Sequence, residues 1–369
     1  MKNRGVAVLG AVLALGCLVA ADGMARFALG AGTVVQVPGK VVAGFGLVLA
    51  VAASVAGRKW SAWVGLAGLL IGFIGWVAVS DQAVFLVPNQ LSGTLAYATP
   101  LVLGGLGGLL CERSGVVNIA IEGQFMLAAF AAVVVASLSD SLAAGLLAGT
   151  LAGVVVGALL GFFSIRLLVN QVMLGIVLNL LIGGLTGFWF MQFVVGDALR
   201  FNSAPVLDRW VLVGLAAVAV SVVWAVLNLT KWGLRVQAVG EHPRAAASAG
   251  VDVRRVRWQA VLAGGALAGL GGCYFTLGTV GQFSRNITSG YGFVALAALI
   301  VGRWRPLPTA LAALGFGFVM QLAGQTQAMG TPINSQLLLI MPYVATIVAA
   351  AGIVGKVRAP AASGRNYEP

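Results

Sequence analysis

Charge is scarce in this chain, and histidine is almost absent. Asp, Glu, Lys and Arg make up 9% of the 369 residues, and His242 is the single histidine. No histidines or carboxylates stand together at the spacing of a metal site or an acid/base pair, and the three cysteines are too widely spaced for a disulfide or metal pattern. No Gly-x-x-x-x-Gly-Lys phosphate loop occurs. The chain therefore has no P-loop ATPase of its own, and it lacks the residue sets of a membrane enzyme.

Hydrophobic residues dominate the composition instead. They account for 60% of the chain, which is far outside the range of soluble domains. A bilayer core about 30 Å thick needs about 20 apolar residues per helical span, and such windows recur from end to end. Because lipid-exposed backbone must satisfy its own hydrogen bonds and no barrel-like alternation is present, we predict an all-α polytopic integral membrane protein with about 10–12 transmembrane helices. The apolar runs that carry this prediction are 6–21, 41–56, 63–79, 91–110, 120–137, 142–160, 172–190, 211–229, 260–280, 291–301, 307–322 and 337–353.

Lysine and arginine are distributed unevenly between the segments that join these runs. With the N-terminus in the cytoplasm and every run spanning, 17 of the 22 Lys and Arg residues fall on the cytoplasmic side. Positive residues concentrate on that side of membrane proteins, so we predict that both termini are cytoplasmic. Lys2 and Arg4 before the first run also fit a signal peptide, and we expect a retained first helix instead.

The run at 291–301 is too short to cross a membrane as a helix. Its 11 residues span about 16 Å at 1.5 Å per residue, and glycines and small polar residues precede it. Irregular backbone at membrane depth is tolerated only where protein or a water-filled cavity surrounds it. One interpretation of 282–302 is therefore a broken helix that lines a pathway, with Asn286 and Phe293 as candidate lining residues. The alternative is an ordinary span that begins in a loop.

Two polar residues stand close to the run that starts at 120. Asn118 is a plausible helix N-cap, and Glu122, one turn further on, would be stabilised by the positive end of the helix dipole. That role is purely structural. Ionisable residues at membrane depth also face cavities or partners, so Asn118 and Glu122 are equally candidates for a solute path or gate. Because Glu122 is the one clear carboxylate at membrane depth, a transporter driven by a chain of proton-carrying acids is disfavoured.

Amide and glycine residues recur every four positions through the run at 172–190. They form one slowly rotating stripe along a helix: Gln171, Gly175, Asn179, Gly183 and Gly187. Small residues and amides at such positions allow close packing with hydrogen bonds between helices. The alternative is a stripe that faces the solute, in which Gln171 and Asn179 would hydrogen-bond a neutral hydroxylated or heterocyclic compound. Both roles can hold at different heights along the helix.

A polar island at 238–250 lies in the longest charged loop. Pro243 suits the first position of a helix, because its fixed φ is already helical, and Gly250 suits the stop. The residues between them are nearly all alanine, the best helix former, so we predict a stiff helix of about two turns near 243–250. A rigid helix outside the membrane offers a surface on which another protein can act. The alternative for this basic loop is a contact with anionic lipid.

Four motifs follow one another in a recognisable order. They are Glu-Arg-Ser-Gly-Val-Val-Asn-Ile-x-Ile-Glu-Gly at 112–123, Asn-Gln at 170–171 with Leu-Asn at 178–179, Val-Gly-Glu-His-Pro-Arg-Ala-Ala at 239–246, and Gly-x-Gly-Phe at 290–293 leading to Leu-Ile-Val-Gly at 299–302. Together they resemble the permease subunits of bacterial ABC importers in the branched-chain amino acid and simple-sugar group, most of all the nucleoside (guanosine-type) uptake permeases. The resemblance covers about 91–355. It departs at Ala120, where glycine is frequent, and at His242, where asparagine is commoner.

The resemblance implies an architecture and a set of partners. A type II ABC importer-like permease core at 91–355 would follow accessory transmembrane helices at 1–90, and we expect the cytoplasmic tail at 356–369 to be disordered. The implied partners are a cytoplasmic ABC ATPase, a second related permease, an extracytoplasmic substrate-binding lipoprotein and the lipid of the bacterial cell (inner or plasma) membrane, without nucleic acid. No cofactor is implied on this chain, because ATP and Mg would bind the ATPase.

The resemblance also assigns a role to the polar island. The stretch resembles the loop whose short helix docks in a cleft of the ATPase, and the expected coupling residues are Gly240, Glu241, His242, Pro243, Arg244, Ala245, Ala246 and Gly250. The implied function is a permease subunit that forms the translocation path for a small polar solute, with a nucleoside as the first expectation. A simple-sugar permease of the same family and a stand-alone secondary transporter are the alternatives.

Overall fold

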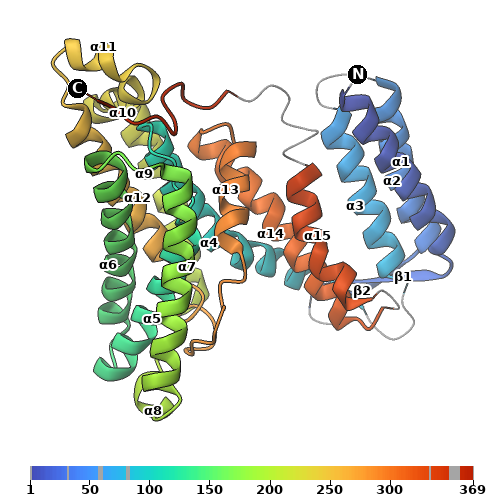
Figure 1. Cartoon of the computed structure of the whole chain (residues 1–369). Coiled ribbons are helices and arrows are strands. Elements are labelled where there is room, and N and C mark those ends of the chain that lie inside the picture. Colours follow the sequence, from blue (N-terminus) through green and yellow to red (C-terminus); the bar gives the residue numbers. More distant parts are fainter. Residues whose placement is uncertain are drawn as a thin grey trace. The chain divides into compact units, whose positions relative to one another are not determined.

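The structure is a computed structural model that describes residues 2–30, 33–56, 61–79, 84–331, 334–348 and 358–368. A helix coincides with every predicted apolar run (Figure 1). These helices are α1 (Lys2–Ala20), α2 (Gly39–Ala56), α3 (Ser61–Val77), α4 (Val87–Arg113), α5 (Ile121–Ser139), α6 (Leu142–Gly161), α7 (Gln171–Trp189), α9 (Arg209–Leu229), α12 (Val253–Cys273), α13 (Tyr291–Val301), α14 (Pro306–Ala328) and α15 (Ser335–Val348).

Seven of the helices in the described residues are long and apolar enough to cross a membrane. They are α2, α4, α5, α6, α7, α9 and α14, where α6 and α7 are each extended by a π-helical turn, η1 (Phe162–Arg166) and η2 (Phe190–Val194). Shorter apolar helices lie at Ala7–Ala20, Val64–Val77 and Tyr291–Val301. The predicted all-α polytopic membrane fold is confirmed.

The chain folds into two compact units. Unit 1 combines Met1–Leu95 with Phe316–Lys356, and unit 2 combines Ala96–Gly315 with Val357–Pro369. The predicted border near residue 90 separates the first helices from the rest, whereas the structure groups those helices with the start of α4, the later part of α14 and α15. The predicted border between core and tail, at 355–356, lies outside the described residues, as does the end of the last predicted run.

Unit 1 contains the described strands of the chain. Helices α1, α2 and α3 pack on one another, and β1 (Met24–Gly30) pairs antiparallel with β2 (Thr33–Pro38) and parallel with β3 (Phe85–Leu86). Threonine and valines in β2 favour extended backbone, because β-branched side chains pack well on a pleated surface. A small cluster of buried apolar residues that includes Val77 and Phe85 joins the sheet to the helices of this unit.

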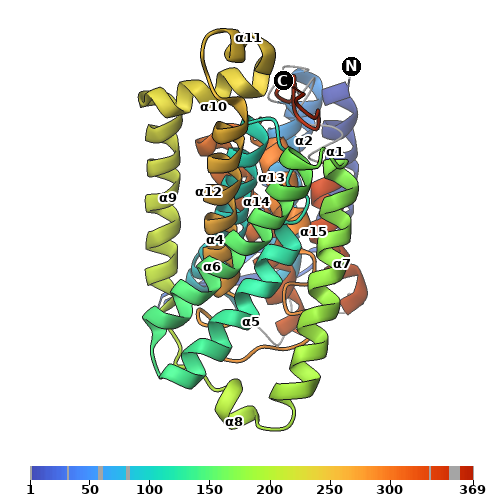
Figure 2. The ribbon, with the colours of Figure 1, turned by 60° about the vertical axis from the view of Figure 1, so that its left-hand side comes forward.

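Unit 2 is a bundle in which α12 packs on α6 and α5 (Figure 2). Glycine makes this packing possible, because a Cβ atom at Gly153 of α6 would overlap the backbone of Gly265 and Gly269 of α12. Such small residues let helices approach closely in membrane proteins. Helix α12 ends at Cys273, seven residues before the end of the predicted run, and turns replace it until α13 begins at Tyr291. The break in this part of the chain is therefore present as predicted.

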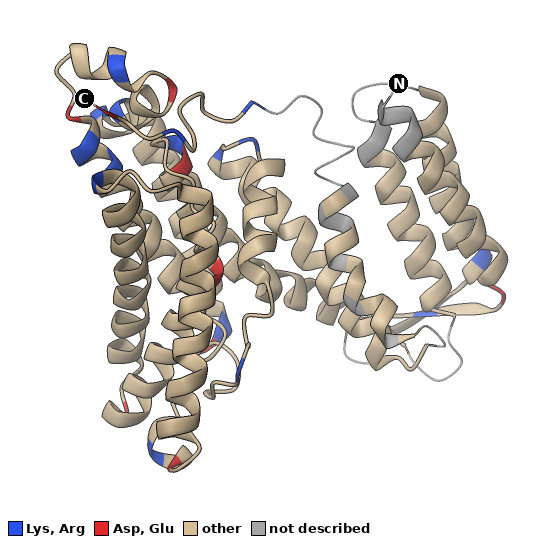
Figure 3. Ribbon diagram, viewed as in Figure 1, with Lys and Arg blue, Asp and Glu red and all other residues tan. Residues whose placement is uncertain are grey.

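One end of unit 2 carries the short helices α10 (Lys231–Glu241) and α11 (Pro243–Ser248), and the described end of the tail lies beside them (Figures 1 and 2). Blue Lys and Arg segments gather at this end of the unit (Figure 3). The tail was expected to be disordered, and the structure gives 358–368 defined contacts. This segment is short and polar, but it forms backbone hydrogen bonds to the unit, for example from the Ala362 N–H to the Gly240 carbonyl oxygen (2.8 Å).

Candidate functional site

The first predicted group meets at the irregular segment 114–120, which joins α4 to α5. Asn118 is fully buried. Its Oδ1 accepts a hydrogen bond from the Ala120 N–H (3.1 Å), and its Nδ2 donates to Gln124 Oε1 (3.0 Å). The predicted N-cap role is wrong, because α5 begins at Ile121 and Ala120 holds the cap position. The Asn118 amide instead fixes the bend that leads into α5.

Glu122 binds the start of the broken helix. Its buried carboxylate accepts three hydrogen bonds: Oε1 from Thr288 Oγ1 (2.6 Å) and the Gly290 N–H (2.8 Å), and Oε2 from the Gly292 N–H (2.7 Å). Gly290 is the N-cap of α13 and has a φ of 84°, and a Cβ at Gly292 would overlap the Glu122 backbone. A helix N-terminus has unpaired N–H groups and a positive dipole end, so a carboxylate there is strongly favoured. Glu122 therefore ties α13 to α5.

The amide side chains of α7 bind the same segment. Gln171 Oε1 accepts a hydrogen bond from the Val117 N–H (2.7 Å). Asn179 Oδ1 accepts one from the Gly123 N–H (2.8 Å), and its Nδ2 donates to the Ile119 carbonyl oxygen (2.9 Å). Each of these contacts satisfies a backbone group that the bend between α4 and α5 leaves without a helical partner. The N-terminal half of the stripe thus has the packing role.

The other half of the α7 stripe is open. No atom lies within 4 Å of a Cβ built at Gly183, and at Gly187 the neighbour is Arg285 Nε at 3.9 Å. The two amides of the stripe therefore form hydrogen bonds within the protein, whereas no side chain or backbone packs closely against its last two glycines. Both amides that were expected to bind solute lie in the packed half, and a solute-facing role for the open half stays a prediction.

Asn286 and Phe293 do not join the buried group. Asn286 is exposed and has a φ of 59°, and the side chain of Phe293 is 50% exposed. The other four predicted path residues converge on 117–124, where protein groups occupy their hydrogen-bonding atoms. The structure therefore places four predicted path residues in one hydrogen-bonded group within the protein, and the other two, Asn286 and Phe293, at the surface of the broken helix.

The second predicted group lies on α10, α11 and the residues that bound them. Pro243 holds the first position of α11, and the Ala246 N–H donates to the His242 carbonyl oxygen (2.9 Å). Gly250 has a φ of 81°, the left-handed conformation that glycine adopts most easily, and the chain turns there toward α12. The predicted short helix is confirmed, with Pro243 at its start and Gly250 just after its end.

Gly240 joins this loop to the bundle. A Cβ atom there would overlap the carbonyl oxygen of Arg113 at the end of α4, so α10 and α4 meet backbone to backbone. The tail binds the same place from the other side, because Ala362 N–H donates to the Gly240 carbonyl (2.8 Å) and Gly364 N–H to the Gly115 carbonyl (3.3 Å). The loop is therefore held by two other segments of the chain.

Arg257 of α12 lies beneath the tail and is 1% exposed. Its Nε donates to the Ser114 carbonyl oxygen (3.2 Å), and its Nη1 donates to the carbonyl oxygen of Arg365 (3.2 Å). Asn366 also donates from Nδ2 to the carbonyl of Leu168. A buried guanidinium needs such oxygen partners, and backbone carbonyls supply them for Nε and Nη1, whereas Nη2 has no hydrogen-bond partner within the described residues. The tail thus closes over the ends of α4, α7 and α12.

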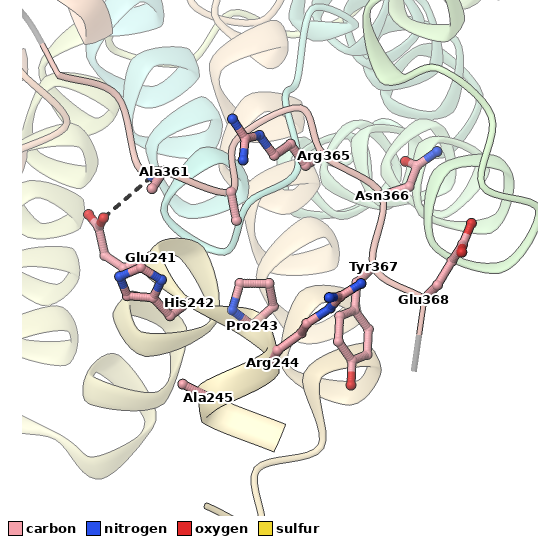
Figure 4. Close-up of a pocket in the computed structure, with 11 residues that line it drawn as sticks. Glu241, His242, Pro243, Arg244, Ala245, Ala361, Arg365, Asn366, Tyr367 and Glu368 are labelled. Carbon is pink, nitrogen blue, oxygen red and sulfur yellow. Dashed lines mark hydrogen bonds between the residues drawn. The ribbon is translucent and has the colours of Figure 1, made fainter. Parts of the chain in front are cut away.

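A cavity of about 710 Å³ separates the start of α11 from the tail (Figure 4). One wall consists of the predicted coupling residues Glu241, His242, Pro243, Arg244 and Ala245, and the other wall of residues 361–362 and 365–368. Glu241 bridges the two, because its Oε2 accepts a hydrogen bond from the Ala361 N–H (3.4 Å) (Figure 4). Five of the eight predicted coupling residues thus line one concave, mixed-charge surface.

The contacts of the tail and the buried position of Arg257 were not predicted from the sequence. The tail has no apolar periodicity that could have indicated its place. Arg257 does carry a signal, because it lies on the same helical face as Val253, Val256 and Ala260, which are all buried. In the described residues no group of three or more His, Cys, Asp or Glu could hold a metal ion.

These features define a class of protein. A bundle of apolar, membrane-length helices with one short apolar helix, α13, and a short helix, α11, in a charged loop is typical of a multi-pass membrane protein. The chain belongs to the family described as branched-chain amino acid transport system / permease component, which matches residues 90–350. It is a transport subunit and not an enzyme.

Three relatives illustrate the similarity. The chain is 34% identical over 305 residues to the nucleoside ABC transporter permease protein NupC of Lactococcus lactis, covering 75% of this chain and 96% of the relative. It is 34% identical to the guanosine ABC transporter permease protein NupQ of Bacillus subtilis (74% and 94%) and 32% identical to the putative glucose ABC transporter permease protein TsgC13 of Haloferax volcanii (70% and 89%). No solved structure matches the chain significantly.

Proposed function

We propose that this chain forms the transmembrane path of an ATP-driven importer and that its solute is a nucleoside. The observation that supports the solute is the 34% identity to relatives named for nucleoside and guanosine transport, over almost their full length. A relative named for glucose at 32% identity keeps a simple sugar as the second candidate. The buried amides do not distinguish these solutes, because their hydrogen bonds are made within the protein.

ATP-driven transport requires a surface on which a separate ATPase acts. The cavity between α11 and the tail supports this role, because a rigid helix forms one wall and the ends of α4, α7 and α12 support the other. In our proposal a cytoplasmic ABC ATPase docks there, binds ATP and Mg on its own chain, and moves α11 as a rigid body. Such rigid-body movement can rock membrane helices between outward- and inward-facing states.

The remaining parts of the proposal follow from the same assignment. A second related permease completes the path, a substrate-binding lipoprotein delivers the solute from outside, and residues 1–90 are accessory helices. The membrane is the bacterial cell membrane, with both termini in the cytoplasm, which the gathering of Lys and Arg around α10 and α11 supports (Figure 3).

Uptake into proteoliposomes tests the proposal. Vesicles would hold the chain with its ATPase and second permease, and the binding lipoprotein would be added with radiolabelled guanosine or glucose. We expect guanosine uptake that depends on ATP. Arg244→Glu combined with Ala245→Asp, on α11, should abolish it, whereas Arg254→Glu, an exposed residue of α12 outside the cavity, should not.

The outcomes separate the alternatives. Uptake of glucose in place of guanosine would show that the transported solute is a sugar. Accumulation driven by an ion gradient without any ATPase would indicate the stand-alone secondary transporter. Normal ATP-driven uptake by the α11 double variant would show that this helix does not couple the ATPase to transport.

A further inference from the structure

A second cavity, of about 600 Å³, opens at the end of unit 2 where α4 meets α10. Its walls come from the last residue of α4, the C-terminal turns of α9, one residue of α10 and the segment 304–308 that leads into α14. The predicted coupling residues do not line it. Its volume falls in the range of ordinary small-molecule pockets.

The cavity is lined by positive charge. Arg113 and Arg305 both line it, and the described lining contains no Asp or Glu. Arg113 is fixed in place, because its Nε donates to the Trp304 carbonyl oxygen (2.7 Å). The carboxylate next in sequence, Glu112, is buried and accepts the Trp304 indole N–H (2.5 Å), and Glu241 of α10 lies near enough to attract the charge of Arg113 without lining the cavity. The side chain of Arg305 is exposed and makes no hydrogen bond or ion pair within the described residues.

Exposed apolar side chains line this cavity at Trp224 and Leu307 and continue beyond it at Leu311. Trp224 of α9 is 42% exposed, and Leu307 and Leu311 of α14 are 53% and 68% exposed. Leu307 and Leu311 are one helical turn apart and therefore share a face. Both α9 and α14 are long and apolar enough to span a membrane. The cationic cavity thus sits where a lipid-facing surface ends, with a tryptophan at the boundary, as is typical of membrane–water interfaces.

We infer that this cavity binds the phosphate headgroup of an anionic phospholipid, with the acyl chains lying along Leu307, Leu311 and Trp224. Arginine is suited to phosphate because its planar guanidinium donates two parallel hydrogen bonds. Basic pockets between membrane helices on the cytoplasmic side are sites for anionic headgroups. A free phosphate ion would use the same two arginines but would leave the apolar mouth uncovered, so the structure favours the lipid. The site is separate from the proposed ATPase-docking cavity and does not depend on the transported solute.

Binding of short-chain lipids to the purified chain in neutral detergent tests the inference. The probes are dihexanoyl phosphatidylglycerol, dihexanoyl phosphatidylcholine and inorganic phosphate, each followed by native mass spectrometry. We expect phosphatidylglycerol to bind with at least several-fold preference over phosphatidylcholine, and inorganic phosphate not to displace it. Arg305→Gln should weaken phosphatidylglycerol binding about fivefold, the value for one arginine at an anionic surface. Arg254→Gln removes the same charge from the same end of the unit and should bind as the unchanged protein does.

Three results would overturn the inference. They are equal binding of the two lipids, equal weakening by Arg305→Gln and Arg254→Gln, and displacement of the lipid by inorganic phosphate at millimolar concentration, which would indicate a phosphate site. Trp224→Ala gives an independent measurement, because it removes apolar contact without charge. It should weaken phosphatidylglycerol while leaving inorganic phosphate unaffected, and the opposite pattern would likewise refute a lipid site.

Discussion

Replacing Glu122 by glutamine should loosen the broken helix while leaving solute recognition intact. The carboxylate accepts three hydrogen bonds, from Thr288 and from the Gly290 and Gly292 N–H groups. A glutamine side chain of the same shape has one oxygen and one NH₂ group. If its oxygen keeps the two bonds of Oε1, its NH₂ faces the Gly292 N–H, and two donors then meet without an acceptor.

The expected loss is about 2–4 kcal/mol. One hydrogen bond to a charged group contributes about 1.5–3 kcal/mol, and a negative charge at a helix N-terminus adds about 0.3–1 kcal/mol. At about 2 °C per kcal/mol, the value for chains somewhat shorter than this one, the apparent Tm in detergent should fall by about 4–8 °C. Glu368→Gln is the matched control, because Glu368 is exposed in the tail, and its Tm should not change.

Transport kinetics decide between the two roles of Glu122. If Glu122 only holds α13 in place, Glu122→Gln should lower the maximal rate of nucleoside uptake with little change in KM, because the carboxylate is enclosed by protein donors. If Glu122 binds the solute instead, the same variant should raise the KM and leave the Tm unchanged. Observation of that second pattern would refute the bracing role derived from the three hydrogen bonds.

Three further predictions concern the α10–α11 loop, the contact of α7 with the segment 114–124, and the tail. Gly240→Ala should lower the Tm and ATP-driven uptake, because its Cβ overlaps the Arg113 carbonyl, whereas Gly214→Ala, with no atom within 4 Å, should change neither; equal behaviour of the two variants would contradict the close approach. Asn179→Leu leaves two backbone groups unpaired and should cost about 2–6 kcal/mol at about 1–3 kcal/mol each, seen as a lower Tm. Deletion of 361–369 should speed hydrogen–deuterium exchange in α10 and reduce uptake; unchanged exchange would show that the tail does not hold the loop.

Local chemistry made some elements predictable. Pro243 and Gly250 bound α11 for reasons that depend only on their own backbone preferences, so the short helix follows from the sequence. The break before α13 was predictable on similar grounds, because the helix at Tyr291–Val301 is too short to span and glycines precede it. In each case the deciding interaction lies within a few residues.

Long-range contacts were not predictable in this way. Thr288 and Glu122 are separated by 166 residues in sequence, and nothing in either local pattern indicates that they meet. The tail is a clearer case, because it is held by backbone hydrogen bonds to Gly240 and Gly115, which any polar sequence could form. Spacing assigned Asn118 a cap, whereas α5 begins at Ile121 and the Asn118 amide bonds the side chain of Gln124. The sequence shows which hydrogen bonds a side chain is able to form, whereas the fold determines which partner it meets.

The segment 114–124 connects the two parts of the candidate site. At one end the tail links it to the α10–α11 loop, through the Gly115 and Gly240 carbonyls. At the other end Glu122 holds the first N–H groups of α13, and amides of α7 bind the backbone between. The segment is largely buried, and hydrogen bonds connect it to α7, α13 and the tail, so we expect it to be displaced as a unit when its neighbours move. If α11 has the coupling role proposed above, its movement would reach α13 through the segment 114–124, which the tail contacts at one end and Glu122 joins to α13 at the other.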